Sequence, residues 1–204
     1  ALQTLERYKQ RLNEVASNLF TLEVEDLVAV RDVVTLLQRT EIVARIAEEI
    51  ERYLVELGAD GRLVELQLRE LMAGVEDDRR LVVLDYFQPD ASWNLEQAME
   101  TLSDLEMEEL LDTEAVAEAL HLSGGAKDTD GSLSPRGHRM LAKVPRLPEA
   151  IATNVVERFG TLDRLLRASA ADLAAVDGVG DTWASTIKDS LNHLAETSIL
   201  DRFN

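Results

Sequence analysis

Hydrophobic side chains recur along most of the chain at intervals of three, four or seven residues, which is the spacing of amphipathic helices. The first such stripe covers residues 2–19, about five turns of helix. A longer stripe covers residues 24–57 and stops at Gly58, a residue type that commonly ends helices. The lengths of the two stripes predict a pair of helices that form a hairpin.

Shorter stripes with the same spacing predict further helices on either side of a polar segment. Before that segment we expect helices at residues 62–72, 79–86, 95–102, 107–111 and 113–120, and after it at 140–144, 149–159, 162–167, 170–176 and 181–195. No stretch alternates between polar and apolar residues strongly enough to indicate a strand. The pattern therefore predicts an all-α fold.

The polar segment, residues 123–137, is rich in Gly, Ser and Pro, a composition typical of linkers and loops. We place a domain boundary there, between a helical linker domain at residues 1–125 and a second domain at residues 126–204. The second domain repeats a theme, because one turn at residues 145–148 and another at residues 178–180 each precede a predicted helix. This repetition predicts two helical hairpins packed as a pseudo-symmetric pair.

Composition narrows the class of protein. With 204 residues, of which 46% are hydrophobic, the chain is long enough to bury a core. It contains no cysteine, which excludes disulfide bonds and thiolate metal sites within it and fits a reducing cytoplasm. No apolar run approaches the roughly 20 residues of a membrane helix. Because the chain opens inside an amphipathic pattern without an initiator Met, we expect a fragment of a longer cytoplasmic protein.

The charge is unevenly distributed along the chain. The net charge is -18, and it arises from residues 1–135, which carry 12 basic and 30 acidic side chains, whereas residues 136–204 carry 9 of each. Strong acidity argues against nucleic-acid binding, because phosphate contacts depend on Lys and Arg. The neutral C-terminal part escapes that objection. If DNA contacts lie there, the acidic linker domain contributes only repulsion and is expected to be dispensable for binding.

The sequence from Leu173 to Leu191 has the signature of a helix-hairpin-helix motif, a glycine turn between two apolar stripes. Glycine permits positive φ and lets bare backbone approach a ligand. Amide groups at the start of the next helix then face an anion, for which a nucleic-acid phosphate is the obvious candidate. The alternative is an ordinary turn between helices. The residues expected to contact DNA are Gly178, Val179, Gly180, Thr182 and Lys188.

A basic patch surrounds the first hairpin turn. Arg136, Arg139, Lys143 and Arg146 lie in a run of sequence without a carboxylate, and we expect them to contact DNA. Pro148 stands where a glycine is expected, so this hairpin presents fewer amide groups. A structural role for the turn and a solvated face for the charges are the alternatives.

Catalysis has little support in the sequence. The three histidines are isolated and lack metal-ligand spacing, so we expect neither a catalytic site nor a bound metal. A DNA glycosylase is one rival hypothesis, since those enzymes carry the same hairpin. They resemble one another in a catalytic Lys two residues after the second hairpin glycine, where this chain has Thr182. The other rival is a protein-interaction or oligomerisation module with degenerate hairpins.

The run SPRGHRMLAKVPRLP at residues 134–148, together with the Asp177-Gly-Val-Gly180 turn, resembles the C-terminal part of the DisA family of bacterial DNA integrity scanning proteins. The opening LQTLERYK and the long helices after it are similar to the central linker of that family. The resemblance covers essentially the whole chain. It implies an acidic helical linker followed by a tandem helix-hairpin-helix domain.

The resemblance also implies a function. The family recognises branched or damaged DNA without sequence preference, and its full-length members are octameric diadenylate cyclases that make cyclic di-AMP from ATP with a divalent metal. Their Asp-Gly-Ala and Arg-His-Arg motifs are missing here, because Asp60-Gly61 is followed by Arg62 and residues 136–139 read Arg-Gly-His-Arg. We therefore expect a nucleoid-associated chain without enzyme activity or cofactor. Its expected partners are DNA, the missing cyclase domain and further copies joined through the linker.

Overall fold

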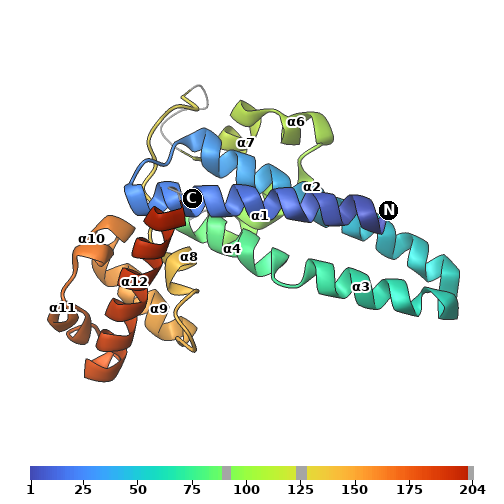
Figure 1. Ribbon diagram of the computed structural model, residues 1–204. Coiled ribbons are helices and arrows are strands. Elements are labelled where there is room, and N and C mark those ends of the chain that lie inside the picture. The colour runs from blue at the N-terminus through green and yellow to red at the C-terminus, as the bar shows by residue number, and fades with distance from the viewer. Residues whose placement is uncertain (89–92, 123–127, 202–204) are drawn as a thin grey trace.

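A computed structural model describes residues 1–88, 93–122 and 128–201 of the chain. Within these residues the fold is all-α, as predicted, and the helices form two groups (Figure 1). An isolated β-bridge between Ala29 and Ser132 joins the start of the second helix to the segment between the groups. Among the described helices, none is both long enough and apolar enough to cross a membrane.

Two long antiparallel helices form the frame of the first group, α1 (Leu2–Glu25) and α2 (Val30–Leu57). The apolar stripe of α1 is buried against α2 and includes Leu5, Leu12 and Leu19. The sequence pattern extends the second helix back to residue 24, but Asp26 adopts φ 56° and its N–H donates to the carbonyl groups of residues 22 and 23. This left-handed residue ends α1 and allows the chain to reverse.

Shorter helices fold back over this pair and complete the linker domain, the name used here for α1 to α7. They are η1 (Gly58–Gly61), α3 (Arg62–Met72), α4 (Val75–Tyr86), α5 (Leu95–Asp104), α6 (Met107–Leu111) and α7 (Thr113–Ala119). Helix α3 returns along α1, where the Lys9 ammonium group donates to the carbonyl oxygens of Leu71 at 2.7 Å and Ala73 at 3.3 Å. The apolar core of this domain draws on residues from Leu5 to Leu122.

The second group, called the hairpin domain, has a core of its own. Its helices are α8 (His138–Leu141), α9 (Glu149–Phe159), α10 (Leu162–Arg167), α11 (Ala170–Ala174) and α12 (Gly180–Asp201). Its core contains Leu141, Val155, Leu165, Leu173 and Ile187, one side chain from each helix in turn, with further apolar residues around them. The predicted bounds of α9 and α10 are those observed, whereas α12 continues six residues beyond the predicted end at residue 195.

The segment between the two groups is tied to the linker domain. The Val30 N–H donates to the Gly131 carbonyl at 2.9 Å, and the Leu133 N–H donates to the Val28 carbonyl at 2.9 Å. Residues 129–133 of the predicted loop at 123–137 therefore run along the start of α2, whereas Pro135 and Arg136 bond to α10 and α4. The predicted domain boundary between residues 125 and 126 lies outside the described residues.

A buried polar cluster joins the two domains. The Arg139 guanidinium of α8 donates to the Glu23 carboxylate of α1 at 2.6 Å. The Tyr86 hydroxyl of α4 donates to the same carboxylate at 2.6 Å. Burial raises the pKa of Glu23, and the positive charge of Arg139 opposes that rise. Burial and the neighbouring Glu23 charge also raise the pKa of Tyr86, so its hydroxyl remains a donor.

Asp85 of α4 completes this junction. It is fully buried at the first turn of α8, where it accepts hydrogen bonds from the backbone N–H groups of residues 137, 138 and 139 at 3.0, 2.6 and 3.0 Å. Burial raises the pKa of Asp85 to about 6, while the amide donors and Arg139 pull it down. Phe20 and Val24 of α1 add apolar contacts to the hairpin core. Helices α1 and α4 therefore fix the position of the first hairpin.

Candidate nucleic-acid interface

The two hairpins share one backbone design. Val144 in the first turn corresponds to Val176 in the second. The carbonyl of each valine accepts a hydrogen bond from the N–H three residues further on, and the N···O distance is 3.4 Å in the first turn and 3.1 Å in the second. Two residues after each valine the backbone is left-handed, at Arg146 (φ 59°) and at Gly178 (φ 78°). The repeat expected from the sequence is therefore present in the backbone itself.

The second hairpin places bare backbone at the start of a long helix. Gly178 and Gly180 have φ values of 78° and 63°, the left-handed region that glycine enters without strain. Val179 between them is 3% exposed, so it anchors the turn in the core. The first N–H groups of α12 have no partner within the helix, and the exposed Asp181 and Thr182 place this helix end at the surface. These amide N–H groups can donate hydrogen bonds to an anion.

The first hairpin presents a charge where the second has glycine. Arg146 is exposed and holds a left-handed conformation that residues with a side chain rarely adopt. Pro148, which corresponds to Gly180, has no N–H to donate. Helix α9 begins at Glu149, so a carboxylate stands in its first turn. This hairpin therefore offers a guanidinium group and fewer amides.

A side chain that sequence analysis missed connects the two turns. The Asn154 amide nitrogen of α9 donates to the Asp177 carbonyl at 3.1 Å, immediately before Gly178. A single Asn within a helical pattern gives no signal of a partner 23 residues away. The bond holds the second turn against α9, the helix that follows the first turn.

The predicted basic patch does not form one exposed surface. The Arg136 guanidinium turns back onto the linker domain, where it donates to the Phe87 carbonyl at 2.6 Å and lies 5.6 Å from the centre of the Phe87 ring. Burial lowers the pKa of Arg136. Arg139 belongs to the buried cluster and also donates to the Ala16 carbonyl at 3.3 Å. These contacts assign both arginines to the domain junction, and the DNA contacts expected of them from the sequence stay a prediction.

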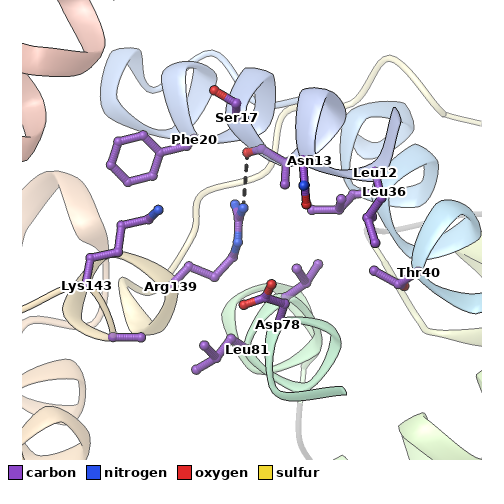
Figure 2. A pocket seen from close by; sticks show the side chains of 13 residues that line it. Leu12, Asn13, Ser17, Phe20, Leu36, Thr40, Asp78, Leu81, Arg139 and Lys143 are labelled. Carbon is purple, nitrogen blue, oxygen red and sulfur yellow. Dashed lines mark hydrogen bonds between the residues drawn. The ribbon is translucent and has the colours of Figure 1, made fainter. Parts of the chain in front are cut away.

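Lys143 lies beside a cleft of about 360 Å³ between α1, α4 and the first hairpin (Figure 2). Its ammonium nitrogen is 4.8 Å from the centre of the Phe20 ring. Figure 2 also shows Arg139 extending across the cleft toward α1, with Asp78 on the α4 wall. Both cations therefore face α1, although the backbone of Lys143 directly precedes the first turn and the residue is exposed.

In the second hairpin, the predicted contacts divide into two kinds. The Lys188 ammonium donates to the Leu166 carbonyl at 3.0 Å, so this half-buried side chain ties α12 to α10. Trp183 packs half-buried against the hairpin core. Thr182 is exposed in the first turn of α12. At the start of α12, the Thr182 side chain reaches solvent beside the exposed Asp177 and Asp181.

Further exposed cations of the hairpin domain lie outside the predicted patch. They are Arg158 of α9 and Arg164 and Arg167 of α10. Arg167 pairs with Asp163 at 3.0 Å. Sequence analysis passed over them because each has a carboxylate close by in the chain, whereas the run around Arg146 has none. They spread positive charge over the domain without concentrating it at one point.

Comparison with known proteins identifies two family models along the chain. The model described as the DisA bacterial checkpoint controller linker region matches residues 1–129, and a helix-hairpin-helix motif model matches residues 143–200. The DNA integrity scanning protein DisA of Frankia alni is 53% identical over 204 residues, and that of Streptomyces coelicolor is 54% identical over 206 residues. These alignments cover the whole chain but 57% and 55% of the two relatives. The chain thus spans little more than half the length of these relatives.

Proposed function

Because this chain belongs to the family of DisA checkpoint-controller linker regions and continues into a helix-hairpin-helix module, we propose that its hairpin domain binds DNA through phosphates, without reading base sequence. The observation that carries the proposal is the repeated left-handed turn, at Arg146 and at Gly178, each directly before a helix N-terminus. A phosphate is the anion that two such turns would meet repeatedly along a DNA strand.

Each hairpin contributes a different chemistry in this proposal. At the second turn, the amides of α12 and the Thr182 hydroxyl donate to phosphate oxygens, and the glycines keep side chains out of the approach. At the first turn, Arg146 supplies a guanidinium that pairs with a phosphate. Asp177 and Asp181 flank the second turn and repel the backbone of DNA. Affinity per chain is therefore modest, and its salt dependence is that of a few phosphate contacts.

The finer part of the proposal concerns the full-length protein. Branched or damaged DNA is the preferred ligand, and its binding is coupled to cyclic di-AMP synthesis by the region that precedes this chain in longer relatives. In this scheme ATP and a divalent metal are bound by that region. Support for a mechanical coupling comes from the buried Arg139 and Glu23 pair, which joins the first hairpin to α1.

Fluorescence anisotropy with a four-way junction and a duplex of equal length tests the proposal. We expect binding to both at about 50 mM salt and a loss of roughly tenfold or more at about 200 mM, as for a few phosphate contacts. Tighter binding of the junction supports the branched preference, whereas equal affinities refute that preference alone. No binding at the lower salt, with self-association of the chain instead, would favour the interaction-module hypothesis.

The Arg146→Gly variant tests whether the first turn itself contacts DNA in the same anisotropy experiment. Glycine accepts φ 59° without strain, so the first turn keeps its shape while the charge is removed. We expect weaker binding of both DNA forms, with a salt dependence reduced by about one phosphate contact. An unchanged affinity would show that the first turn does not touch DNA.

A further inference from the structure

The far end of the linker domain carries an unusual concentration of exposed apolar side chains. This distal tip, residues 53–66, consists of the end of α2, η1 and the first turns of α3, at the end remote from the hairpin domain (Figure 1). Among the described residues, ten large hydrophobic side chains are exposed, and five of them belong to the tip: Tyr53, Val55, Leu57, Leu63 and Leu66. Single exposed apolar residues are ordinary, but a cluster of this kind marks an interaction surface.

On α3, the exposed apolar side chains are separate from the core-facing stripe. Leu54 of α2 and Val64 of α3 pack against the linker core, so each helix already has an inward apolar face. Leu63 and Leu66, three residues apart, share a second face of α3. On α2, Leu57 lies seven residues after the buried Ile50 and is therefore on the core-facing side, yet it is 56% exposed. A helix with apolar residues on both faces is typical of one that is covered on both sides.

The start of the chain lies beside this tip. The bond between Lys9 and the Leu71 carbonyl sets α1 level with α3 at that point. From there, α1 runs back to Ala1 and α3 runs back to Leu63 over eight residues each, about 12 Å at the helical rise. Ala1 is therefore level with Leu63, and Figure 1 shows the N-terminus at the same end of the molecule as the tip.

The longer relatives continue on that side. The chain covers 57% of the DisA protein of Frankia alni and corresponds to its C-terminal portion. We propose that the region preceding residue 1 in the full-length protein docks on the distal tip and buries its apolar cluster. The covalent connection at Ala1 supplies that region at a high effective concentration. This inference does not depend on DNA binding.

The charge of the tip distinguishes this occupant from a second copy of the chain. Residues 53–66 contain three carboxylates and one arginine. Two such tips packed face to face would bring like charges together, which opposes association. The docking surface on the preceding region is therefore apolar with a basic rim, so that it complements the acidic surroundings of the cluster.

The absence of cysteine from the chain makes a clean experiment available. Leu63→Cys places a thiol in the tip, and Leu111→Cys places one on α6 at similar exposure, 61% against 67%. Each variant is prepared as residues 1–204 and as the full-length protein, and maleimide labelling is followed by mass spectrometry of the modified peptide. We expect the Leu63→Cys thiol to react at least about tenfold more slowly in the full-length protein, since burial limits access. The Leu111→Cys thiol should react at the same rate in both.

Equal labelling rates for Leu63→Cys in the two forms would overturn the proposal. Photo-crosslinking from a benzophenone attached to the same thiol identifies the occupant in the full-length protein. Crosslinks to peptides that precede residue 1 support docking of that region. Crosslinks to residues 1–204 of a second copy, or slow labelling of the short form together with dimerisation in light scattering, would assign the tip to self-association and refute it.

Discussion

Gly178 and Gly180 show how backbone conformation at single residues determines the proposed interface. A Cβ atom at Gly178 would come no closer than 3.9 Å to Asn154, and one at Gly180 would meet nothing within 4 Å. Space inside the protein therefore does not demand glycine at either position. The demand comes from positive φ, which costs a residue with a side chain about 1–2 kcal/mol, and from the approach of a ligand to the turn.

Replacing both glycines with alanine tests this distinction. We expect the Gly178→Ala, Gly180→Ala variant to lose about 2–4 kcal/mol of folding free energy through strain, and to bind DNA at least tenfold more weakly. Gly74→Ala is the matched control, because Gly74 has φ 79° with nothing within 4 Å but lies in the linker domain. That variant should lose stability and keep its DNA affinity. Urea unfolding and anisotropy measure the two quantities, and equal affinity in all three proteins would leave the glycines with a purely structural role.

Arg139 and Lys143 illustrate how residues of one charge, four positions apart, take different roles. Arg139→Ala leaves the buried Glu23 without its cation, which costs about 3–5 kcal/mol. Lys143→Ala removes an exposed charge and a contact with Phe20 worth about 0.5–1 kcal/mol. We therefore expect Arg139→Ala to destabilise the protein strongly and Lys143→Ala to leave it folded. If Arg139→Ala instead unfolds like the wild type but binds DNA weakly, Arg139 contacts DNA as the sequence first indicated.

At the scale of single elements, the short helix α8 depends on a side chain from another domain. It has four residues, and Asp85 of α4 accepts the N–H groups at its start. Burial raises the pKa of Asp85 from 3.8 to about 6. The folded state therefore binds the Asp85 proton more tightly than the unfolded state does. This contribution to stability is complete below about pH 4 and is lost as the pH rises through 6.

A pH series on the Asp85→Asn variant measures this effect. Asparagine cannot ionise, so the free energy of unfolding of the wild type relative to the variant should fall between pH 4 and pH 7. The rise in the Asp85 pKa from 3.8 to about 6 corresponds to a change in the free energy of unfolding on the order of 3 kcal/mol. Other carboxylates titrate in both proteins and largely cancel in the difference. If the wild type gains stability over the variant as the pH rises, the amide donors outweigh burial and the folded pKa lies below 3.8.

The helices themselves were largely predictable, because their apolar stripes are local. The bounds of α3, α6, α9 and α10 agree with the prediction to the residue. The break at Asp26 was missed because the apolar pattern continues through it, and a left-handed Asp leaves no clear trace in sequence. The extension of α12 was missed because its last turns are stabilised by tertiary contact, where Ser198 donates to Thr21 of α1 at 3.2 Å.

The candidate site was predictable where its requirement is local and not where it is tertiary. The glycine turn follows from backbone geometry within a few residues, so sequence located it. The Arg139 guanidinium bonds to Glu23, 116 positions away in the sequence, and the Lys188 ammonium bonds to a carbonyl 22 positions away. A run of basic residues carries no information about such partners. Burial decided which of these cations face solvent.

For the whole molecule, the junction between the domains is the feature that sequence composition concealed. Charge segregation presents the linker as an acidic spacer with little to do with the hairpins. In the structure, α1 and α4 supply Glu23, Asp85 and the apolar contacts of Phe20 to the hairpin domain. The linker therefore supports the hairpins physically while its net charge opposes their proposed ligand.

A fragment of residues 131–204 separates the structural support that the linker gives the hairpins from the repulsion that its charge exerts on DNA. Removing the linker leaves Arg139 without Glu23 and α8 without its Asp85 cap, so we expect the fragment to lose about 3 kcal/mol or more of folding free energy. It also removes the excess acid, so the DNA affinity per folded molecule should equal or exceed that of the whole chain. Urea unfolding measures the folding free energy, and anisotropy at low temperature and about 50 and 200 mM salt measures the DNA affinity.

A fragment as stable as the whole chain would show that the junction contributes nothing to folding. A fragment that is folded yet fails to bind would mean that the linker itself provides DNA contacts, or avidity through dimerisation.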